Sequence, residues 1–156
     1  MKTLVFFIAV CYSISAFAQV DNGISKDERN KEIARNFYED LWFNDRTYNY
    51  IQYMPDEYIA NDIGERKNNK EPAVEQKITA DRFWDGGTMS GKIDYQIAEG
   101  DLVATRWLWS YKSNTLIGKL FEGKNLPIIK VFRINNEGKI VELWNHRHDI
   151  DTNQTL

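Results

Sequence analysis

Residues 138–149, GKIVELWNHRHD, decide the fold of this chain, and they contain both of its histidines. Residues 135–138 are typical of a turn, and the β-branched and apolar residues after them predict a strand that leaves a hairpin. Because side chains alternate along a strand, one face carries a carboxylate, an indole and both imidazoles, at Glu142, Trp144, His146 and His148. So many titratable groups on one face indicate either a surface that meets solvent or a partner subunit, or the wall of a pocket.

The same stretch, with IIKVFRINNE at residues 128–137, resembles the closing hairpin of the SnoaL-like polyketide cyclases and the predicted ester cyclases. Two other segments are similar to the same group of proteins: ERNKEIARNFYEDLW at residues 28–42 and AEGDLVATRW at residues 98–107. That group belongs to the nuclear transport factor 2-like superfamily. The resemblance therefore implies an α+β cone, with three N-terminal helices packed on a curved, mainly antiparallel sheet.

The first 18 residues predict a signal peptide for export. Lys2 supplies a positive end, residues 4–10 a short apolar core, and residues 16–18, Ala-Phe-Ala, a cleavage site. The apolar run is too short for a transmembrane helix, so we expect a secreted or periplasmic protein. Cys11, the only cysteine, lies in this segment, so the mature chain is expected to have no disulfide and no cysteine nucleophile.

The mature chain is expected to divide into a flexible start over residues 19–24, one domain over residues 25–150 and a tail over residues 151–156. The formal net charge of the whole chain is −3, which argues against nucleic acid, and against a membrane after signal cleavage, as its partner. Five tryptophans and eight tyrosines suit an aromatic-lined cavity, so a small hydrophobic molecule is the expected partner. Tryptophan stripes are also common at interfaces, and a homodimer is therefore expected.

The spacing of apolar residues predicts the remaining elements. Ser25 and Glu28 have the form of a capping box at the start of the first helix, and Pro72 suits the first turn of the third. In one strand, Ile93, Tyr95 and Ile97 alternate as a half-buried face. Helices are expected over residues 26–44 and 48–54 and from residue 72 to the glycine pair at 86–87, and strands over residues 56–63, 90–98, 102–112 and 128–134.

The segment YIANDIG, residues 58–64, has two interpretations. Asn61 and Asp62 before a glycine are ordinary turn residues. The segment also resembles SnoaL-like proteins, which commonly hold a histidine at the position of Asn61, and ketosteroid isomerases, which hold a base aspartate at that of Asp62. Tyr38 has the spacing of a core residue, but the matching helix of the isomerases points a tyrosine hydroxyl into the cone.

The resemblance to the cyclases implies an intramolecular aldol closure, run by one acid/base aspartate without metal or cofactor. Such a base needs a pKa raised by a dry pocket, and the developing oxyanion needs a hydrogen-bond donor. The acidic residue that the family carries four positions after the tryptophan corresponds to His148, and Asp149 follows on the opposite face of a regular strand. Three alternatives remain: His148 is the base, or a bulge turns Asp149 to the face of His148, or the chain has lost catalysis. Asp62 is a further candidate base, as in the isomerases.

No metal is expected, because His146 and His148 with Glu142 form a weak ligand set that has no obvious fourth group. Residues 113–127 retain little of the loop that borders the cavity mouth in the family. The identity of the substrate therefore cannot be inferred from the family's known substrates. The expected function is acid/base proton transfer on a small hydrophobic carbonyl compound; the alternatives are a non-catalytic protein that holds a ligand in the same pocket and a structural or dimerisation module. Ligand contacts are expected from Tyr38, Asn61, Arg106, Trp107, Trp144 and His146.

Overall fold

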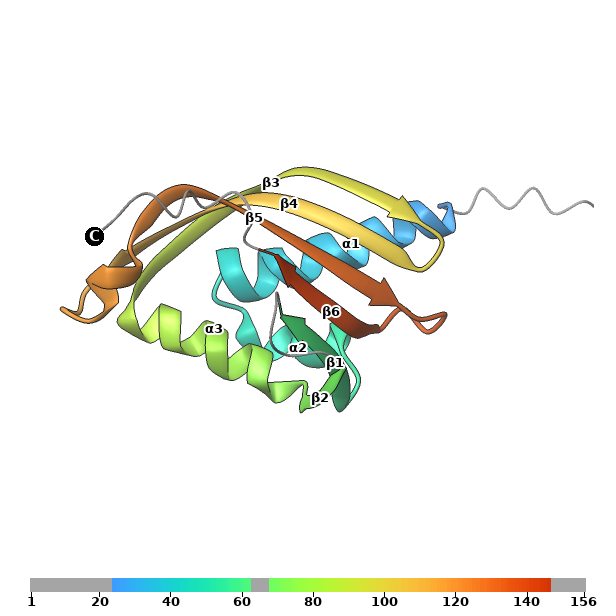
Figure 1. Ribbon diagram of the computed structural model, residues 1–156, viewed down its shortest axis with the longest axis horizontal. Coiled ribbons are helices and arrows are strands. Elements are labelled where there is room, and N and C mark those ends of the chain that lie inside the picture. Colours follow the sequence, from blue (N-terminus) through green and yellow to red (C-terminus); the bar gives the residue numbers. More distant parts are fainter. Residues whose placement is uncertain (1–23, 63–67, 147–156) are drawn as a thin grey trace, which may run out of the picture.

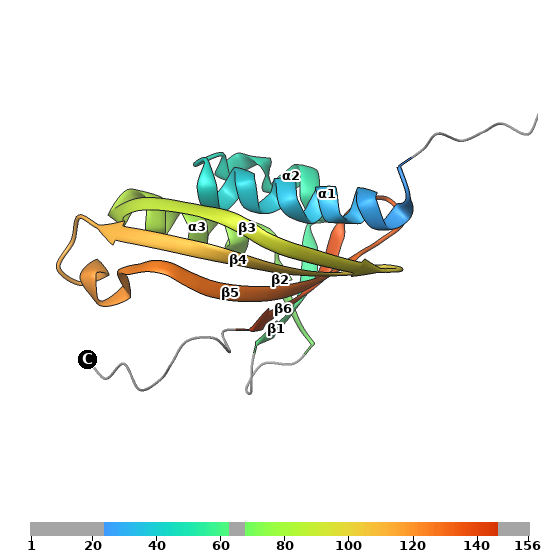
Figure 2. The same ribbon diagram turned by 90° about the horizontal axis from the view of Figure 1, so that it is seen from above.

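The computed structural model describes residues 24–62 and 68–146. Three α-helices cover one face of a six-stranded sheet, which confirms the expected α+β class (Figures 1 and 2). The helices are α1 (Lys26–Tyr38), α2 (Tyr50–Tyr53) and α3 (Val74–Gly86), with a π-helical turn η1 (Glu39–Phe43) and 3-10 turns η2 (Thr47–Asn49) and η3 (Gly118–Phe121). The strands are β1 (Glu57–Asp62), β2 (Asn69–Pro72), β3 (Gly87–Glu99), β4 (Leu102–Ser113), β5 (Gly123–Ile134) and β6 (Ile140–His146).

The sheet has the strand order β2-β1-β6-β5-β4-β3. Neighbouring strands run antiparallel except for β1 and β6, which are parallel. The last strand therefore lies inside the sheet and joins the early strands β1 and β2 to the long β3–β4–β5 meander. None of the described helices is long and apolar enough to cross a membrane.

The start of α1 follows the sequence prediction in part. The Oγ atom of Ser25 accepts a hydrogen bond from the backbone N–H of Glu28 at 3.2 Å, which caps one of the free helix donors. The Glu28 carboxylate instead accepts from Lys31 at 2.8 Å, so the reciprocal half of the capping box does not form.

The hairpin of β3 and β4 turns at Gly100, whose φ of +66° is favourable for glycine. On β4, alternate residues from Val103 to Tyr111 are buried, as the sequence predicts. On β3 the prediction of one half-buried face is wrong, because the register shifts between Ile93 and Tyr95. This bulge reverses the alternation, and Tyr95 and Ile97 are 49% and 63% exposed.

The edge strand β2 was not predicted, and it changes the role of Pro72. This residue pairs with Glu57 across the β1–β2 ladder and ends the strand, whereas α3 begins at Val74. Proline is tolerated on an edge strand, because such a strand has a hydrogen-bonded neighbour on one side only and the missing N–H can face the open side. The predicted end of the third helix is confirmed, since Gly87 caps α3.

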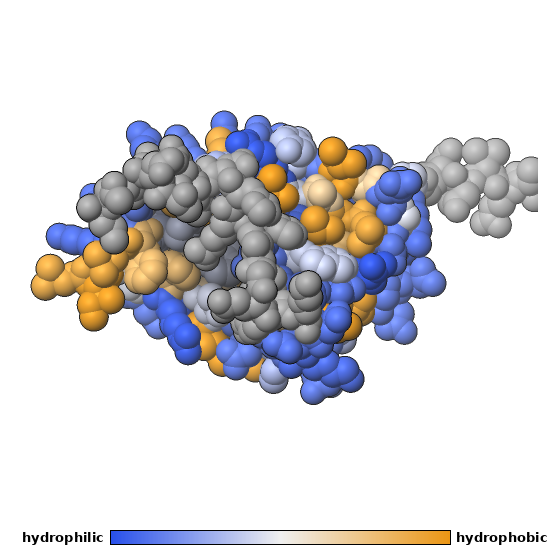
Figure 3. All heavy atoms as spheres, viewed as in Figure 1, coloured by the Kyte–Doolittle hydropathy of each residue, from blue (hydrophilic) through white to orange (hydrophobic). Residues whose placement is uncertain are grey.

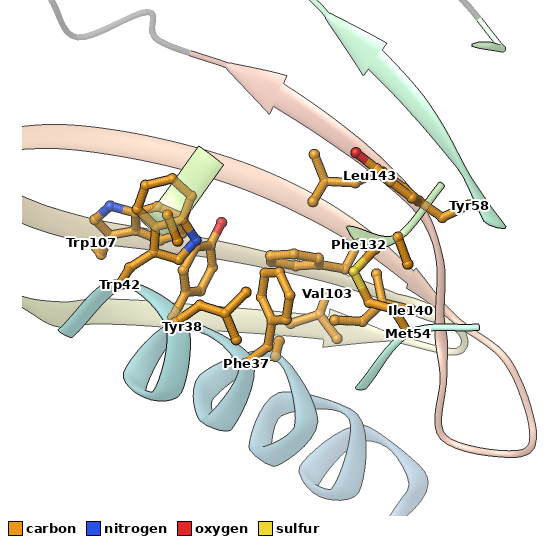
Figure 4. Packing of buried hydrophobic residues seen from close by; sticks show 14 of the residues in the cluster. Phe37, Tyr38, Trp42, Met54, Tyr58, Val103, Trp107, Phe132, Ile140 and Leu143 are labelled. Atoms are coloured by element: carbon orange, nitrogen blue, oxygen red, sulfur yellow. The ribbon is translucent and has the colours of Figure 1, made fainter. Parts of the chain in front are cut away.

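The core lies between the helices and the sheet and is dominated by aromatic side chains. Figure 4 shows Phe37 and Tyr38 of α1 projecting toward Phe132 of β5. All three are 0% exposed, and burying side chains of this size stabilises a fold by about 1.5–3 kcal/mol each.

Candidate functional site

A cavity of about 770 Å³ opens between α3, η3 and the helix-covered face of the sheet. This volume is in the usual range for pockets that hold small molecules. Most of the wall is aromatic or aliphatic, from Trp42, Tyr58, Ala60, Phe83, Trp107, Trp109, Leu120, Phe121, Leu126, Ile128 and Leu143.

The aromatic wall is built by strand alternation on β4 and by one side chain of α3. Trp109 and Tyr111 stack with their ring planes 5° apart and their centroids 5.6 Å apart. Phe83 of α3 packs edge-on against Trp109, at 5.4 Å between centroids. These contacts hold the rings in fixed orientations, so the wall has a defined shape.

Lys130 of β5 is a cavity-lining residue that the sequence analysis missed. It is only 7% exposed. Its side-chain nitrogen lies 5.4–5.6 Å from the ring centroids of Tyr38, Trp42 and Trp107, which is within the range of cation–π attraction. The signal that could have identified it is a lysine inside the apolar run at residues 128–132.

Asn145 of β6 is the register partner of Lys130 across the β5–β6 ladder, and it also lines the cavity. An amide and an ammonium group thus occur on neighbouring strands of an otherwise apolar wall. Lysine has three N–H donors and asparagine has two, so this part of the cavity suits a ligand with an acceptor oxygen.

The cavity-facing side of β6 is the one that carries Leu143 and Asn145. Glu142 and Trp144 lie on the opposite face, where Arg133 donates to the Glu142 carboxylate at 3.0 Å and stacks over the Trp144 ring at 5.6 Å. The interpretation of this face as a pocket wall is therefore corrected for these two residues. Their placement favours the alternative, a surface that meets solvent or a partner.

The three predicted bases are only partly covered by the described residues. His148 and Asp149 lie outside them. Asp62 is described by its backbone, which pairs with the cavity-lining Asn145 in the parallel β1–β6 ladder. The backbone of His146 likewise pairs with Ile129 of β5. Their catalytic or ligand-binding roles stay predictions.

Two of the predicted ligand contacts lie near the cavity, but only Trp107 is part of its described wall. Trp107 lines it, and Tyr38 packs directly against Trp107 from behind. Tyr38 is 0% exposed, its hydroxyl has no hydrogen-bond partner in the described part of the chain, and burial raises its pKa well above the usual value. The hydroxyl therefore remains neutral over the physiological pH range.

Asn61 and Arg106 are not brought to this cavity. Asn61 donates to Glu142 at 2.9 Å and accepts from the backbone N–H of Asn68 at 2.8 Å, which ties the two ends of the β1–β2 connection together. Arg106 forms an ion pair with Asp94 of β3. Any ligand that these residues, or Trp144, contact would lie on the other face of the sheet.

A second polar group at the cavity was also missed by the sequence analysis. The hydroxyl of Tyr58 donates to Glu71 at 2.9 Å and accepts from the side-chain amide of Gln76 at 2.7 Å. All three residues line the cavity. Their mutual hydrogen bonds fix the Tyr58 ring, which is 3% exposed, against the wall.

The tryptophans of the wall add potential donors. Within residues 24–62 and 68–146, the indole N–H groups of Trp42, Trp107 and Trp109 are buried and have no hydrogen-bond acceptor. Buried polar groups are normally paired, so these three indoles are exceptions within the described residues. Among the same residues, no cluster of three His, Cys, Asp or Glu side chains could hold a metal ion.

Comparison with known proteins finds likeness in structure rather than in sequence. No family model matches the chain, and no curated protein matches it. A proposed polyketide cyclase from Acidithiobacillus ferrooxidans is 18% identical, with a TM-score of 0.61 over 79% of this chain and 90% of that one. A proposed SnoaL-like polyketide cyclase from Jannaschia is 13% identical, with a TM-score of 0.57 over 80% and 89%.

An epoxide hydrolase from Mycobacterium tuberculosis, described as LEH-like, has a TM-score of 0.60 at 14% identity, over 80% of this chain and 88% of that one. Identities this low show the fold alone. The chain has the nuclear transport factor 2-like fold of SnoaL-like cyclases, which confirms the architecture predicted from its sequence. Proteins of this shape carry different chemistries, so the activity has to be argued from the cavity.

Proposed function

We propose that this protein is a cofactor-independent enzyme of the cyclase or isomerase type, which moves a proton on a small, largely apolar carbonyl compound. The observation that carries the proposal is the cavity itself: an aromatic wall with the ammonium group of Lys130 and the amide of Asn145 on adjacent strands. An apolar ligand with one acceptor oxygen matches this combination.

The proposed step begins with the carbonyl oxygen of the ligand directed toward Lys130 and Asn145. A base removes a proton from the carbon next to the carbonyl, and the electron pair of that C–H bond moves to the oxygen as an enolate. The two donor groups stabilise the new negative charge, and low polarity around them strengthens the interaction. The enolate carbon then attacks a second carbonyl carbon of the same molecule, whose oxygen takes the proton back from the base, or the base returns the proton to another carbon of a conjugated enolate.

The base in this proposal is Asp62, His148 or Asp149. Asp62 is supported by its backbone position, next to Asn145 in the β1–β6 ladder. His148 and Asp149 are supported by the resemblance of the closing stretch to the cyclases. A carboxylate or imidazole beside aromatic rings is expected to have a pKa suited to proton abstraction near neutral pH.

The proposal is tested by hydrogen–deuterium exchange at the α-carbon of 2-tetralone in D₂O, followed by proton NMR. The wild-type protein should catalyse the exchange, and Lys130→Met, which keeps an unbranched apolar side chain but lacks the ammonium group, should lower the rate more than tenfold. At least one of Asp62→Asn, His148→Ala and Asp149→Asn should do the same. Asp94→Asn, on the opposite face of the sheet, is the matched control and should retain the wild-type rate.

Full exchange activity in all four variants would show that the cavity does not perform this chemistry. So would the absence of catalysis by the wild type on 2-tetralone and on a panel of β-diketones. Circular dichroism of each variant confirms that a lost rate does not reflect a lost fold.

A second candidate function is supported by one observation. Lys130, the buried lysine of the described cavity wall, offers N–H donors between aromatic rings. This suits a protein that only holds an acidic or carbonyl-bearing ligand. Native mass spectrometry of protein from its own source distinguishes the two functions, because a binding protein should carry one ligand that it leaves unchanged on incubation.

We also propose that the protein is exported after cleavage before Gln19. The support is the sequence pattern of residues 1–18. Mass spectrometry of the protein from its source organism should give a chain that begins at Gln19, and an intact Met1 or Lys2 terminus in the cytoplasmic fraction would contradict the proposal.

A further inference from the structure

We propose that the connection between β4 and β5 is a membrane-docking tip, which seats against an anionic lipid surface beside the mouth of the cavity. The tip is defined by four apolar side chains in and next to η3: Leu116, Ile117, Leu120 and Phe121. The proposal does not depend on whether the cavity performs chemistry.

The four side chains of the tip are exposed to an unusual extent. Their exposed fractions are 85% for Leu116, 76% for Ile117, 67% for Leu120 and 58% for Phe121. In Figure 3, apolar side chains protrude together at the end of the molecule where the β4–β5 connection lies in Figure 1. A cluster of this kind is unfavourable in water, and it indicates a surface that something apolar covers.

The tip is held in place by hydrogen bonds at its base. The hydroxyl of Thr115 accepts from the backbone N–H of Gly118 at 3.0 Å, and the hydroxyl of Ser113 donates to the carbonyl oxygen of Gly86 at 3.1 Å. The carboxylate of Glu122 accepts from the backbone N–H of Ser113 at 2.8 Å. The apolar side chains are thus presented on an ordered turn.

The charge around the tip is opposite to that of the whole protein. Residues 112–125 contain three exposed lysines, Lys112, Lys119 and Lys124, and one acidic residue, Glu122, in a chain of net charge −3. Screening limits electrostatic attraction to roughly 8 Å at physiological salt, so these local charges decide what the tip attracts. Exposed apolar side chains with lysines near them in the sequence are typical of segments that lie in the interface of an anionic bilayer.

The shape of the tip favours a lipid surface over a second protein molecule. It projects from one end of the molecule and consists of four side chains, whereas a stable protein interface buries about 800 Å² on each partner. A fluid bilayer closes around a projecting turn without needing a complementary surface.

The tip is also continuous with the cavity. Leu120 and Phe121 belong both to the tip and to the cavity wall. A docked tip would place the cavity mouth at the lipid boundary, so an apolar ligand could enter from the bilayer without crossing water. The ligand class that this arrangement fits is a lipid-soluble molecule.

The test uses the chain from Gln19, which contains every described helix and strand and lacks Cys11. Ile117→Cys is labelled with an NBD fluorophore, and Ile97→Cys on β3, which is also highly exposed, is the matched control. Each is titrated with vesicles of phosphatidylcholine alone and with vesicles of phosphatidylcholine and phosphatidylglycerol. The expected result is a blue shift and a rise in emission at position 117, on the anionic vesicles only, with no response at position 97.

Two sets of variants separate the contributions of the lysines and of the apolar side chains to vesicle binding. Replacing Lys119 and Lys124 by glutamine should weaken vesicle binding by about fivefold for each lysine. Leu116→Ser should weaken it as well, whereas Ile51→Ser, which removes another exposed apolar side chain far from the tip in the sequence, should not.

Three results would overturn the proposal. The first is the absence of any response at position 117 to anionic vesicles. The second is a shift that depends on protein concentration without vesicles, which would assign the tip to a second copy of the chain. The third is a shift on adding 2-tetralone alone, which would show that the tip folds onto its own cavity.

Discussion

Replacing Tyr38 by phenylalanine removes one oxygen atom from the centre of the protein, and we expect this change to stabilise the fold. The side chain is 0% exposed, and its hydroxyl has no hydrogen-bond partner in the described part of the chain. A buried polar group without a partner costs about 1–3 kcal/mol. Phenylalanine fills the same ring volume without that cost, so the free energy of unfolding should rise by about 1–2 kcal/mol.

Tyr53 offers the same chemical change with the opposite expected sign. Its hydroxyl donates to the Asp40 carboxylate at 2.6 Å, and its pKa is raised by burial and by this carboxylate. Tyr53→Phe removes a hydrogen bond to a charged group, which is worth about 1.5–3 kcal/mol. The two variants should therefore differ by about 2.5–5 kcal/mol in the free energy of unfolding, or by about 10–20 °C at about 4 °C per kcal/mol.

The assay is urea unfolding followed by circular dichroism, with thermal unfolding as a second measure. A decrease of more than about 1 kcal/mol in Tyr38→Phe would refute the reasoning, because it would mean that the hydroxyl has a stabilising partner.

The pH dependence gives an independent check. The pKa of Tyr38 is raised in the folded state, so above pH 10, the usual tyrosine value, the unfolded chain loses this proton while the folded chain keeps it. The stability of the fold is therefore unaffected by this group below pH 10 and decreases as the pH rises above it. The loss of stability above pH 10 should be smaller in Tyr38→Phe than in the wild type.

Three other changes have expected outcomes. Gly87→Ala should lower the free energy of unfolding by about 1–3 kcal/mol in urea, because its Cβ would overlap the backbone of Lys112; a neutral result would mean that the strands can separate there. Asp40→Asn should lower the free energy of unfolding by about 2–4 kcal/mol, since the side chain of Asp40 is only 9% exposed and pairs with Arg46 at 2.6 Å; stability equal to the wild type would contradict a role for this ion pair. The hydrogen bond from Arg133 lowers the pKa of Asp101, so the contribution of the Asp101 carboxylate to stability is present above pH 3.8 and is lost as the pH falls below it. Between pH 5 and pH 3, the melting temperature of Asp101→Asn should therefore fall less steeply than that of the wild type. Identical slopes would argue against a stabilising pair of Asp101 and Arg133.

The elements whose pattern is local were predictable from the sequence. The N-cap at Ser25, the hairpin at Gly100 and the alternating burial of β4 all follow from neighbouring residues, and all three are observed. The fold itself was predicted through the resemblance of three segments to the SnoaL-like proteins, and the structural comparisons confirm it.

Features that depend on pairing between distant segments were not predictable. The bulge at Ile93 reverses the faces of β3, and strand propensity carries no sign of it. The short edge strand β2 is stabilised by its pairing with β1 rather than by its own polar sequence. Asparagine-rich and lysine-rich segments have low strand propensity, so such a strand is visible only in three dimensions.

The site was predicted in part. Trp107 lies at the cavity as expected, whereas Trp144 lies on the other face of the sheet, because β6 directs Leu143 and Asn145 inward. Lys130 was overlooked, since a single lysine in a strand is usually directed to solvent. Its burial is apparent only once the aromatic rings from α1 and β4 are seen around it.

The parallel pairing of β1 with β6 has a consequence for how the protein is made. The contact between Asn61 and Glu142 joins residues 81 positions apart, and β6 is the element that links both halves of the sheet. During synthesis, the early half of the molecule keeps an unpaired strand edge until β6 has been made. Nascent chains stalled before β6 should therefore be protease-sensitive and prone to edge-to-edge association, and chains in which β6 has also emerged should be resistant.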